Sequence, residues 1–541
     1  MAVFTHTVLI ASAVILVTII AITFMNLVLR LFSNASLPPN LPWAGTGEKG
    51  SRWARAKANL TGITNLRALL DEGYSKYSKL GQTYVLPYYI NGPQIILPNS
   101  QIRWLLEQPD TVLSQEKVNR QFLEADYTFL HANLVDGPVH PEIIQHQLTK
   151  RLNTFTNDVV EEVNICLEEI WGTDTEEWRE VKVYDTMLTL VARLSTRVLV
   201  GVPLCRNADF LKACSQFIRK VALTAAAISL FPRFLKPLVG PIFTLYDYIQ
   251  YQRCSAFLMP TILSRLENLR KYGPQDKAEA PSPNDYIQWA IDHALSKPTI
   301  NPTELDPRVI ACRFSVLAFA AIQSSAITLT NTLFDLAASP SCTGSLARMR
   351  DEVLRATTAA CPPNTTAAAA PQNQQPWSKT TLPHTDSALR ESLRLNGFIE
   401  RGVMKTVVAP QGVTIPDGSR IPFGTKVGVS GYSIHHDEDI YVDARRYRAF
   451  RFVGGVMGEK GEGNGKARGL VATSETFLGF SHGRHACPGR FFAANQLKIA
   501  LAHIALLYEI EPIPRRPANR WFFGHIAPPM TEVLRVRRRK G

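Results

Sequence analysis

The chain lacks the paired-cysteine motifs that bind zinc or carry dithiol redox chemistry. It has eight cysteines in 541 residues, and none belongs to a Cys-x-x-Cys pair. Structural zinc and disulfide exchange therefore gain no support. Most of these cysteines are expected to be small buried hydrophobic residues. Cys487, which lies in a glycine-rich segment, needs a separate explanation.

Other absences narrow the function further. The net charge is +13, but no basic–aromatic repeat accompanies it, so no nucleic-acid partner is expected. No solenoid repeat is present, and no segment resembles a flavin or nicotinamide domain. Hydrophobic residues make up 45% of the chain and charged residues 19%. This balance is typical of a globular enzyme and excludes a disordered chain.

Residues 7–29 form a long apolar run without a charged side chain. A bilayer span needs about 20 such residues, whereas the apolar core of a signal peptide has about 7–15 and follows a basic start. We therefore expect residues 1–32 to be a single transmembrane anchor. Arg30 and further basic residues follow the run, and no Lys or Arg precedes it. The positive-inside rule places the remaining chain in the cytosol.

Residues 33–45 follow as a proline-rich hinge, because closely spaced prolines stiffen a linker. Residues 46–541 are expected to form one large, mainly helical domain. Two strands are predicted around Asn91-Gly92, a strong hairpin signal. Residues 138–300 are mostly helical by pattern, with breaks at Pro232, Pro237 and Pro241.

A long apolar helix is predicted for residues 308–338. Asp306 is a suitable N-cap for it, and Pro307 suits the first helical position. A second hairpin is predicted within residues 412–429, with its turn at Asp417-Gly418.

The most informative motif is residues 480–490, FSHGRHACPGR. Its glycines, Gly483 and Gly489, allow the backbone to approach a flat ligand closely. An amphipathic helix beginning near Gly489 would direct its positive end at Cys487 and favour the thiolate. Two basic residues before the cysteine can meet acidic groups on the ligand's edge. The alternative is a glycine-rich turn with an inert thiol.

This segment resembles the haem-binding signature of the cytochrome P450 superfamily. Phe480, Gly483, Cys487 and Gly489 stand at its spacing, and His485 fills the slot usually held by arginine or histidine. The resemblance implies that Cys487 is the axial ligand of haem b. A thiolate ligand donates electron density to the iron and favours O–O cleavage. The sequence GRHACPGRFFA is most similar to that of superfamily members from fungal secondary metabolism.

A second motif is Glu391-Ser392-Leu393-Arg394. At positions i and i+3 of a helix, Glu391 and Arg394 share one face and can pair. Taken alone, this spacing indicates only a common surface ion pair. In the superfamily, a Glu-x-x-Arg pair before the cysteine joins a further arginine, for which Arg451 is the candidate. The resemblance implies a structural role for these three residues.

A third motif lies in the predicted long helix, where Gln323 and Ser324 follow Ala320-Ala321-Ile322. Many superfamily monooxygenases have an acid and an alcohol here that relay protons to bound oxygen. Gln323 cannot carry a proton as an acid does, whereas Ser324 keeps a hydroxyl that donates and accepts hydrogen bonds. The resemblance implies that Ser324 and water form the relay, with Gln323 as the altered catalytic position. The alternative is an ordinary buried helix containing serine.

The resemblance also implies basic partners for the haem propionates. His485 is the first candidate, Lys405 the second, and Lys150 or Arg151 the third, and each is otherwise a solvated surface residue. Substrate contacts are expected from apolar residues, which suit a bulky lipophilic substrate but also suit a plain core. They are Phe319, Ala320, Val403, Met404 and Phe522.

The implied fold is the mainly α haem-thiolate fold with a small β-rich part, anchored in the endoplasmic reticulum membrane. The implied activity is oxidation, most simply hydroxylation, of a terpenoid, indole-terpenoid or polyketide intermediate. Electrons from NADPH would arrive through a separate NADPH-cytochrome P450 reductase, with cytochrome b5 as a further partner. One alternative is a member that desaturates, closes a ring or isomerises. The other is a non-catalytic membrane haem-binding protein.

Overall fold

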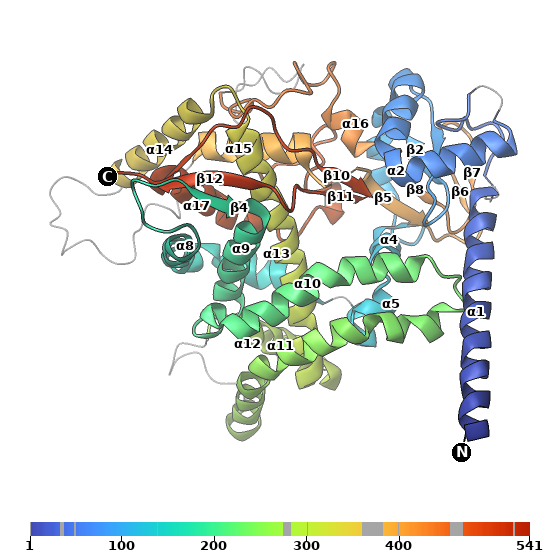
Figure 1. Ribbon diagram of the computed structural model, residues 1–541, viewed down its shortest axis with the longest axis horizontal. Helices are drawn as coiled ribbons and strands as arrows, with labels where there is room; N and C mark the ends of the chain where they lie inside the picture. Colours follow the sequence, from blue (N-terminus) through green and yellow to red (C-terminus); the bar gives the residue numbers. More distant parts are fainter. Residues whose placement is uncertain are drawn as a thin grey trace.

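The fold is mainly helical, with small sheets in more than one place among the helices (Figure 1). It is described by a computed structural model that covers residues 2–32, 37–47, 50–137, 139–273, 283–299, 301–359, 382–398, 400–454, 469–522 and 525–540. The expectation of a mainly α fold with a small β-rich part is confirmed.

The α-helices, in chain order, are α1 (Ala2–Phe32), α2 (Arg52–Lys76), α3 (Ile102–Glu107), α4 (Gln115–Phe122), α5 (Ala125–Thr128), α6 (Ala132–Asp136), α7 (His140–Ile143), α8 (Thr156–Trp171), α9 (Val183–Leu199), α10 (Ala208–Ser229), α11 (Lys236–Tyr272), α12 (Tyr286–Leu295), α13 (Pro307–Ala337), α14 (Cys342–Ala359), α15 (Pro383–Asn396), α16 (Gly431–His435) and α17 (Arg490–Leu507). The strands are β1 (Tyr84–Leu86), β2 (Gln94–Leu97), β3 (Leu113–Ser114), β4 (Arg179–Lys182), β5 (Gly402–Val407), β6 (Val413–Thr414), β7 (Arg420–Ile421), β8 (Lys426–Val429), β9 (Tyr508–Ile510), β10 (Arg520–Phe522), β11 (His525–Ala527) and β12 (Val533–Arg538).

Helix α13 is the central helix of the fold. The Asp306 carboxylate accepts a hydrogen bond from the Arg308 backbone N–H at 2.7 Å, and Pro307 is the first helical residue, as expected. The helix is apolar on all sides, a pattern typical of a fully buried helix. Helices α9, α10, α11, α15 and α17 pack around it. Among the described residues it alone has the length and apolarity of a membrane span, but 72% of that window is buried, so it is a core helix.

The largest sheet has the strand order β1-β2-β8-β5-β3. Strands β1 and β2 form the predicted hairpin around Asn91-Gly92, and β6 and β7 form the second hairpin. Strand β2 runs parallel to β8, and β8 runs antiparallel to β5. The register of β5 shifts between Gly402 and Lys405, which indicates a bulge there. Apolar clusters cover both faces of this sheet.

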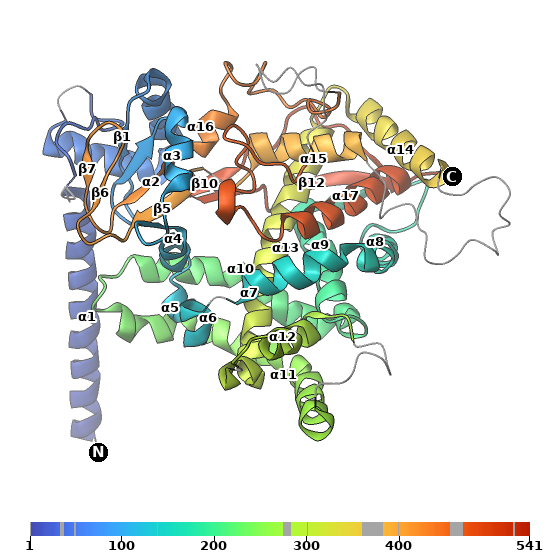
Figure 2. The same cartoon turned by 180° about the vertical axis from the view of Figure 1, so that it is seen from behind.

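Helix α1 projects away from the rest of the chain, and only its C-terminal end lies against the other elements (Figures 1 and 2). There the Arg30 guanidinium donates hydrogen bonds to the carbonyls of Ile90 and Ser229 at 3.0 Å and of Phe231 at 3.2 Å. Arg30 thus fastens α1 both to the β1–β2 hairpin and to the connector between α10 and α11.

The prolines of residues 138–300 break the helices only in part. Pro232 lies in the connector between α10 and α11, and Pro237 is in the first turn of α11. The predicted break at Pro241 is wrong, because α11 continues through it and through Pro260. Proline near a helix start removes few hydrogen bonds, and α11 is held by packing against α10 and α13.

Candidate active site

The segment around Cys487 is a tight loop that ends at the start of α17. The backbone N–H of Cys487 donates to the Phe480 carbonyl at 2.9 Å, which closes the loop. Gly483 has φ of +77°, and a Cβ there would lie 2.6 Å from Leu106 Cδ2, so no larger residue fits. Ser481 also has a positive φ, of 60°. The glycine requirement expected from the sequence is therefore a packing requirement at Gly483.

The sulfur of Cys487 lies at the N-terminus of α17. Burial raises the pKa of this thiol, whereas the backbone N–H groups of Gly489 and Arg490 and the charge of Arg490 lower it. A Cβ on Gly489 would lie 4.0 Å from the sulfur, and Gly489 is the N-cap of the helix. The helix end thus meets the sulfur, with backbone N–H groups that favour an anion.

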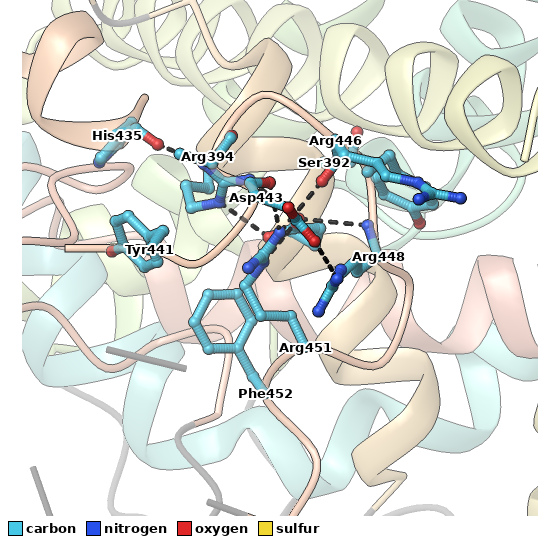
Figure 3. Close-up of polar contacts among 12 residues, drawn as sticks. Ser392, Arg394, His435, Tyr441, Asp443, Arg446, Arg448, Arg451 and Phe452 are labelled. Carbon is cyan, nitrogen blue, oxygen red and sulfur yellow. Dashed lines mark hydrogen bonds and ion pairs between the residues drawn. The ribbon is translucent and has the colours of Figure 1, made fainter. Parts of the chain in front are cut away.

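Glu391, Arg394 and Arg451 form one buried ion cluster, part of which Figure 3 shows. Glu391 accepts from Arg394 Nε at 2.8 Å and Nη2 at 2.9 Å, and from Arg451 Nε at 2.8 Å. All three side chains have 0% exposure. Backbone carbonyls satisfy the remaining guanidinium hydrogens, including those of Ala444 at 2.8 Å and Arg446 at 3.0 Å. This saturation is what a buried ion cluster needs to be tolerated.

His435 joins that cluster to the cysteine loop. Its backbone carbonyl accepts a hydrogen bond from Arg394, and its Nε2 accepts one from the Leu478 backbone N–H at 2.8 Å. Leu478 in turn accepts from the Ser481 N–H at 2.8 Å, within the loop. Burial lowers the pKa of His435, so the ring stays neutral and can accept. By sequence, His435 belongs to a polar stretch that suggests a solvated loop, but it is buried here, because its partners Arg394 and Leu478 lie 41 and 43 residues away in the chain.

Helix α13 has one exposed stretch in its otherwise buried middle. Ala320 is exposed and Phe319, Gln323 and Ser324 are partly exposed, although residues 309–318 and 325–337 are all buried. The Ser324 hydroxyl donates to the Ala320 carbonyl at 2.9 Å, which leaves its oxygen lone pairs available. The Gln323 amide contacts the Tyr184 hydroxyl of α9, with Nε2 at 3.1 Å.

A buried hydrogen-bond chain joins α13 to the helix that follows Cys487. Gln496 of α17 donates from Nε2 to Ser325 Oγ at 3.1 Å, and its Oε1 accepts from Ser195 Oγ of α9 at 3.2 Å. Each of the three side chains is at most 2% exposed. These hydrogen bonds fix Ser325, the neighbour of Ser324, to α17, the helix that begins beside Cys487. Sequence patterns gave no sign of it, since its members lie far apart in the chain.

Three basic residues meet on the segment between α3 and β3. Lys405 Nζ and Arg484 Nη2 donate to the Gln108 carbonyl at 3.3 Å and 2.6 Å. Arg484 and His485 both contact the Asp110 carboxylate at 2.9 Å. Burial and the charge of Arg484 lower the pKa of Lys405 to about 8. His485 and Lys405 are thus brought together, with Arg484 as a third basic residue.

Lys150 and Arg151 lie elsewhere, on the helical segment between α7 and α8. Lys150 is exposed, and Arg151 is partly buried and donates to Gln147 Oε1. In the described part of the chain neither contacts His485 or Lys405. The segment that carries them packs against α17.

The expected substrate residues of β5 lie on the bulge. Val403 has φ of 50°, which is unusual for a β-branched residue, and its side chain is buried. Met404 lies directly over Gly428 of β8, where a Cβ would come within 2.1 Å of its Sδ. Bulges re-aim side chains next to functional sites. Phe522 ends β10, and its side chain lies outside the described residues.

Comparison with known proteins identifies the family. The Cytochrome P450 family model matches residues 138–529. The chain belongs to the cytochrome P450 family. Cytochrome P450 monooxygenase 151 of Postia placenta is 34% identical over 87% of this chain and 89% of its own length. Cytochrome P450 monooxygenase lnaC of Aspergillus flavus is 32% identical over 88% and 90%, and polB of Polytolypa hystricis is 30% identical over 93% and 94%.

A solved structure supports the same fold. The cytochrome P450DA heme domain superposes with a TM-score of 0.65 at 15% identity, covering 93% of this chain and 98% of that one. The chain is therefore a P450 enzyme of the monooxygenase class. Membership of the family implies haem iron.

The residues of this P450 fit such a group. A single thiol at a helix N-terminus would supply a thiolate ligand for iron. The exposed stretch at Ala320, where α13 carries small side chains, leaves surface for a flat ligand. Lys405 and Arg484 outnumber Asp110 and would supply cations for acidic groups at its edge, beside His485.

Proposed function

We propose that this P450 is a haem-thiolate monooxygenase that hydroxylates a bulky lipophilic secondary-metabolite intermediate, such as a terpenoid, indole-terpenoid or polyketide. The observation that carries the proposal is the Cys487 sulfur at the start of α17, beside the backbone N–H groups of Gly489 and Arg490. When bound there, haem supplies the oxygen-activating chemistry.

The chain's own residues have distinct roles in this proposal. Cys487 binds the iron, and Phe480 and Gly483 shape the loop that presents it. His485 and Lys405 hold the propionates, with Lys150 and Arg151 as further candidates. Ser324 would relay a proton: its free lone pairs would accept from water, and its own hydrogen, which is donated to the Ala320 carbonyl at 2.9 Å, would turn away from that carbonyl and be passed on.

The substrate would be held by apolar side chains that flank this site. Phe319 and Ala320 approach it from α13, and Val403 and Met404 from the bulge of β5. Phe522 is a fifth candidate. Glu391, Arg394 and Arg451 are structural, since all three side chains are fully buried and saturated with protein partners.

We further propose that α1 anchors the enzyme in the endoplasmic reticulum membrane, with residues 46–541 as the cytosolic catalytic domain. In the described part of α1 the side chains of Val17, Phe24 and Leu29 are 64%, 65% and 61% exposed, which suits a lipid environment. Electrons from NADPH would come from a separate P450 reductase, with cytochrome b5 as a second partner.

The test uses the full-length chain, expressed with a P450 reductase in microsomes. The reduced CO complex is expected to show the red-shifted Soret band of a thiolate-ligated haem, and Cys487→Ser is expected to abolish it. Cys342→Ser, which changes another buried free cysteine, should retain the band. Persistence of the band in Cys487→Ser would show that the ligand assignment is wrong.

The substrate is found by mass spectrometry of host metabolites with the gene intact and deleted. Hydroxylation predicts an accumulated precursor that lacks one oxygen of the lost product. A pair that differs by two hydrogens, or an isomeric pair, would instead support desaturation, ring closure or isomerisation.

A further inference from the structure

The sheet that carries β5 contains buried cations that the proposed haem chemistry does not use. Arg401, just before β5, donates from Nη1 to Gln94 Oε1 at 3.0 Å, and its guanidinium lies 4.2 Å from the centre of the Tyr88 ring. Lys426 is the first residue of β8 and is 6% exposed. Its ammonium group has no hydrogen bond or ion pair to any residue that the structure describes.

Strand register aligns these groups. Lys426 is the direct neighbour of Gln94 in β2 and of Thr406 in β5. Direct neighbours project from the same face of a sheet. The Thr406 hydroxyl is buried, and it too lacks a hydrogen-bond partner within the described ranges. A row of polar side chains therefore crosses a sheet whose other residues are mostly apolar and buried. Two of these side chains, Lys426 and Thr406, have no hydrogen-bond partner among the described residues.

The surroundings of Lys426 are positively charged. Its burial and the charges of Arg401, Lys236 and Arg233 lower its pKa to about 7, and the charge of Glu124 opposes this. That carboxylate is already paired with Lys236 at 2.5 Å. A buried ammonium group without a described partner is costly in its charged form, and an anion bound beside it would stabilise that form.

Glu400 does not neutralise Arg401. Its carboxyl group lies 3.8 Å from the guanidinium, but burial raises its pKa to about 8. Burial therefore favours the protonated, uncharged form of this carboxyl group, and the charge of Arg401 opposes it. Both of its oxygens are buried without a hydrogen bond to a described residue.

The charged groups around Lys426 come from segments next to α4, α5 and the start of α11. Glu124 lies between α4 and α5, and Arg233 and Lys236 lie where the α10–α11 connector enters α11. Helix α4 packs against β5, and α5 packs against α10 and α11. Figures 1 and 2 both show α4 between the sheet and the α10–α11 pair. Along β5, Arg401 precedes the expected substrate residues Val403 and Met404 by only two and three positions.

We propose that Arg401 and Lys426 bind a carboxylate group of the substrate. The inference rests on the proposed function and specifies its substrate class as a lipophilic carboxylic acid. A guanidinium holds a carboxylate through two parallel N–H···O bonds, and the ammonium of Lys426 gains the partner it lacks. Fixing one end of an apolar molecule determines which carbon faces the reaction centre. A neutral analogue would leave these buried cations unpaired and would be rejected.

The test measures ligand binding to the full-length, haem-loaded enzyme. The probes are ω-imidazolyl octanoic, decanoic and dodecanoic acids and the matching ω-imidazolyl alcohols. The imidazole nitrogen coordinates haem iron and shifts the Soret band, so binding is visible whatever the natural substrate is. The wild type is expected to bind at least one acid about tenfold more tightly than its alcohol, a difference of 1.4 kcal/mol.

Four variants at the site and one surface control locate the effect. Lys426→Met and Arg401→Gln should each reduce the preference for the acid, and the double variant should abolish it without weakening alcohol binding. Lys426→Arg should retain the preference. Lys182→Met, which changes an exposed lysine before α9, should behave as wild type. Lys426→Met should also melt at the same or a higher temperature, because it removes an unpaired buried charge.

The proposal is overturned if no acid is preferred at any chain length, or if the double variant keeps the preference. A second outcome also overturns it: the double variant keeps the preference for the acid but no longer binds phosphatidylglycerol vesicles more tightly than phosphatidylcholine vesicles. That result would indicate a site for a lipid headgroup. Failure of the proposed function looks different: neither the red-shifted CO band nor any imidazole-induced shift would appear.

Discussion

Gln323 of α13 and Tyr184 of α9 are hydrogen-bonded to each other. The amide nitrogen lies 3.1 Å and the amide oxygen 3.3 Å from the phenol oxygen. Tyr184 is 1% exposed, and burial raises the pKa of its hydroxyl. The residue that stands at the family's acid position therefore links two core helices, and its neighbour Ser324 faces the exposed stretch.

Tyr184→Phe is expected to lower the free energy of unfolding by about 1 kcal/mol, because the Gln323 amide loses its partner. Gln323→Ala should cost a similar amount, and the double variant should cost less than the two single variants added together. Denaturant unfolding of the solubilised enzyme, followed by circular dichroism, measures this. Strictly additive costs would show that the contact contributes nothing.

Ser324→Ala is expected to uncouple NADPH use from product formation and to raise peroxide several-fold, because the proton relay loses its hydroxyl. Ser324→Thr should largely restore coupling. The matched control is Ser315→Ala, whose hydroxyl also donates to a carbonyl of α13, that of Ala311. Coupling that is the same in both alanine variants would remove Ser324 from the mechanism.

Arg451→Ala should lower the free energy of unfolding by about 3–5 kcal/mol, because it leaves the buried Glu391 carboxylate with half of its charge partners. Loss of haem absorbance on purification should accompany it. Arg448→Ala, which removes a partly exposed ion pair with Asp443, should cost at most about 1 kcal/mol. Equal costs for the two variants would contradict a structural role for the buried cluster.

Glu400 gives stability a pH dependence of known sign. Its pKa in the folded chain is about 8, above the ordinary value of 4.5. The folded state therefore binds more protons between these values, and stability falls as pH rises from 5 toward 8. Glu400→Gln should remove up to about 1.4 kcal/mol of that fall per pH unit. Melting temperatures of both proteins at pH 5, 6 and 7 test this, and parallel curves would contradict it.

Lys426 affects stability in the opposite direction and over a different pH range. Its pKa is lowered from 10.5 to about 7, so the folded state binds fewer protons and stability should rise as pH increases above 7. Lys426→Met should flatten this rise, because it removes the cost of the buried charge at low pH, and it should leave the slope of the curve below pH 6 unchanged. A slope above pH 7 that survives the substitution would show that other groups cause it.

Local patterns were enough to predict several elements of the fold. The N-cap at Asp306, the start of α17 beside Cys487 and both hairpins depend on residues only a few positions apart. The role of Pro241 was misjudged for the same reason, since packing of α11 against its neighbours outweighed the local preference of proline. The resemblance to a known family added Arg451, which lies 60 residues from Glu391.

By itself, the sequence determined the mainly helical class, the central apolar helix and the cysteine loop, because periodicity, caps and glycines act over short distances. Only the tertiary structure decided that Gln323 contacts Tyr184, 139 residues away, and that Lys426 is buried without a polar partner among the described residues. Such contacts depend on which helices and strands become neighbours. Their cost or benefit comes from burial, which single-residue patterns do not contain.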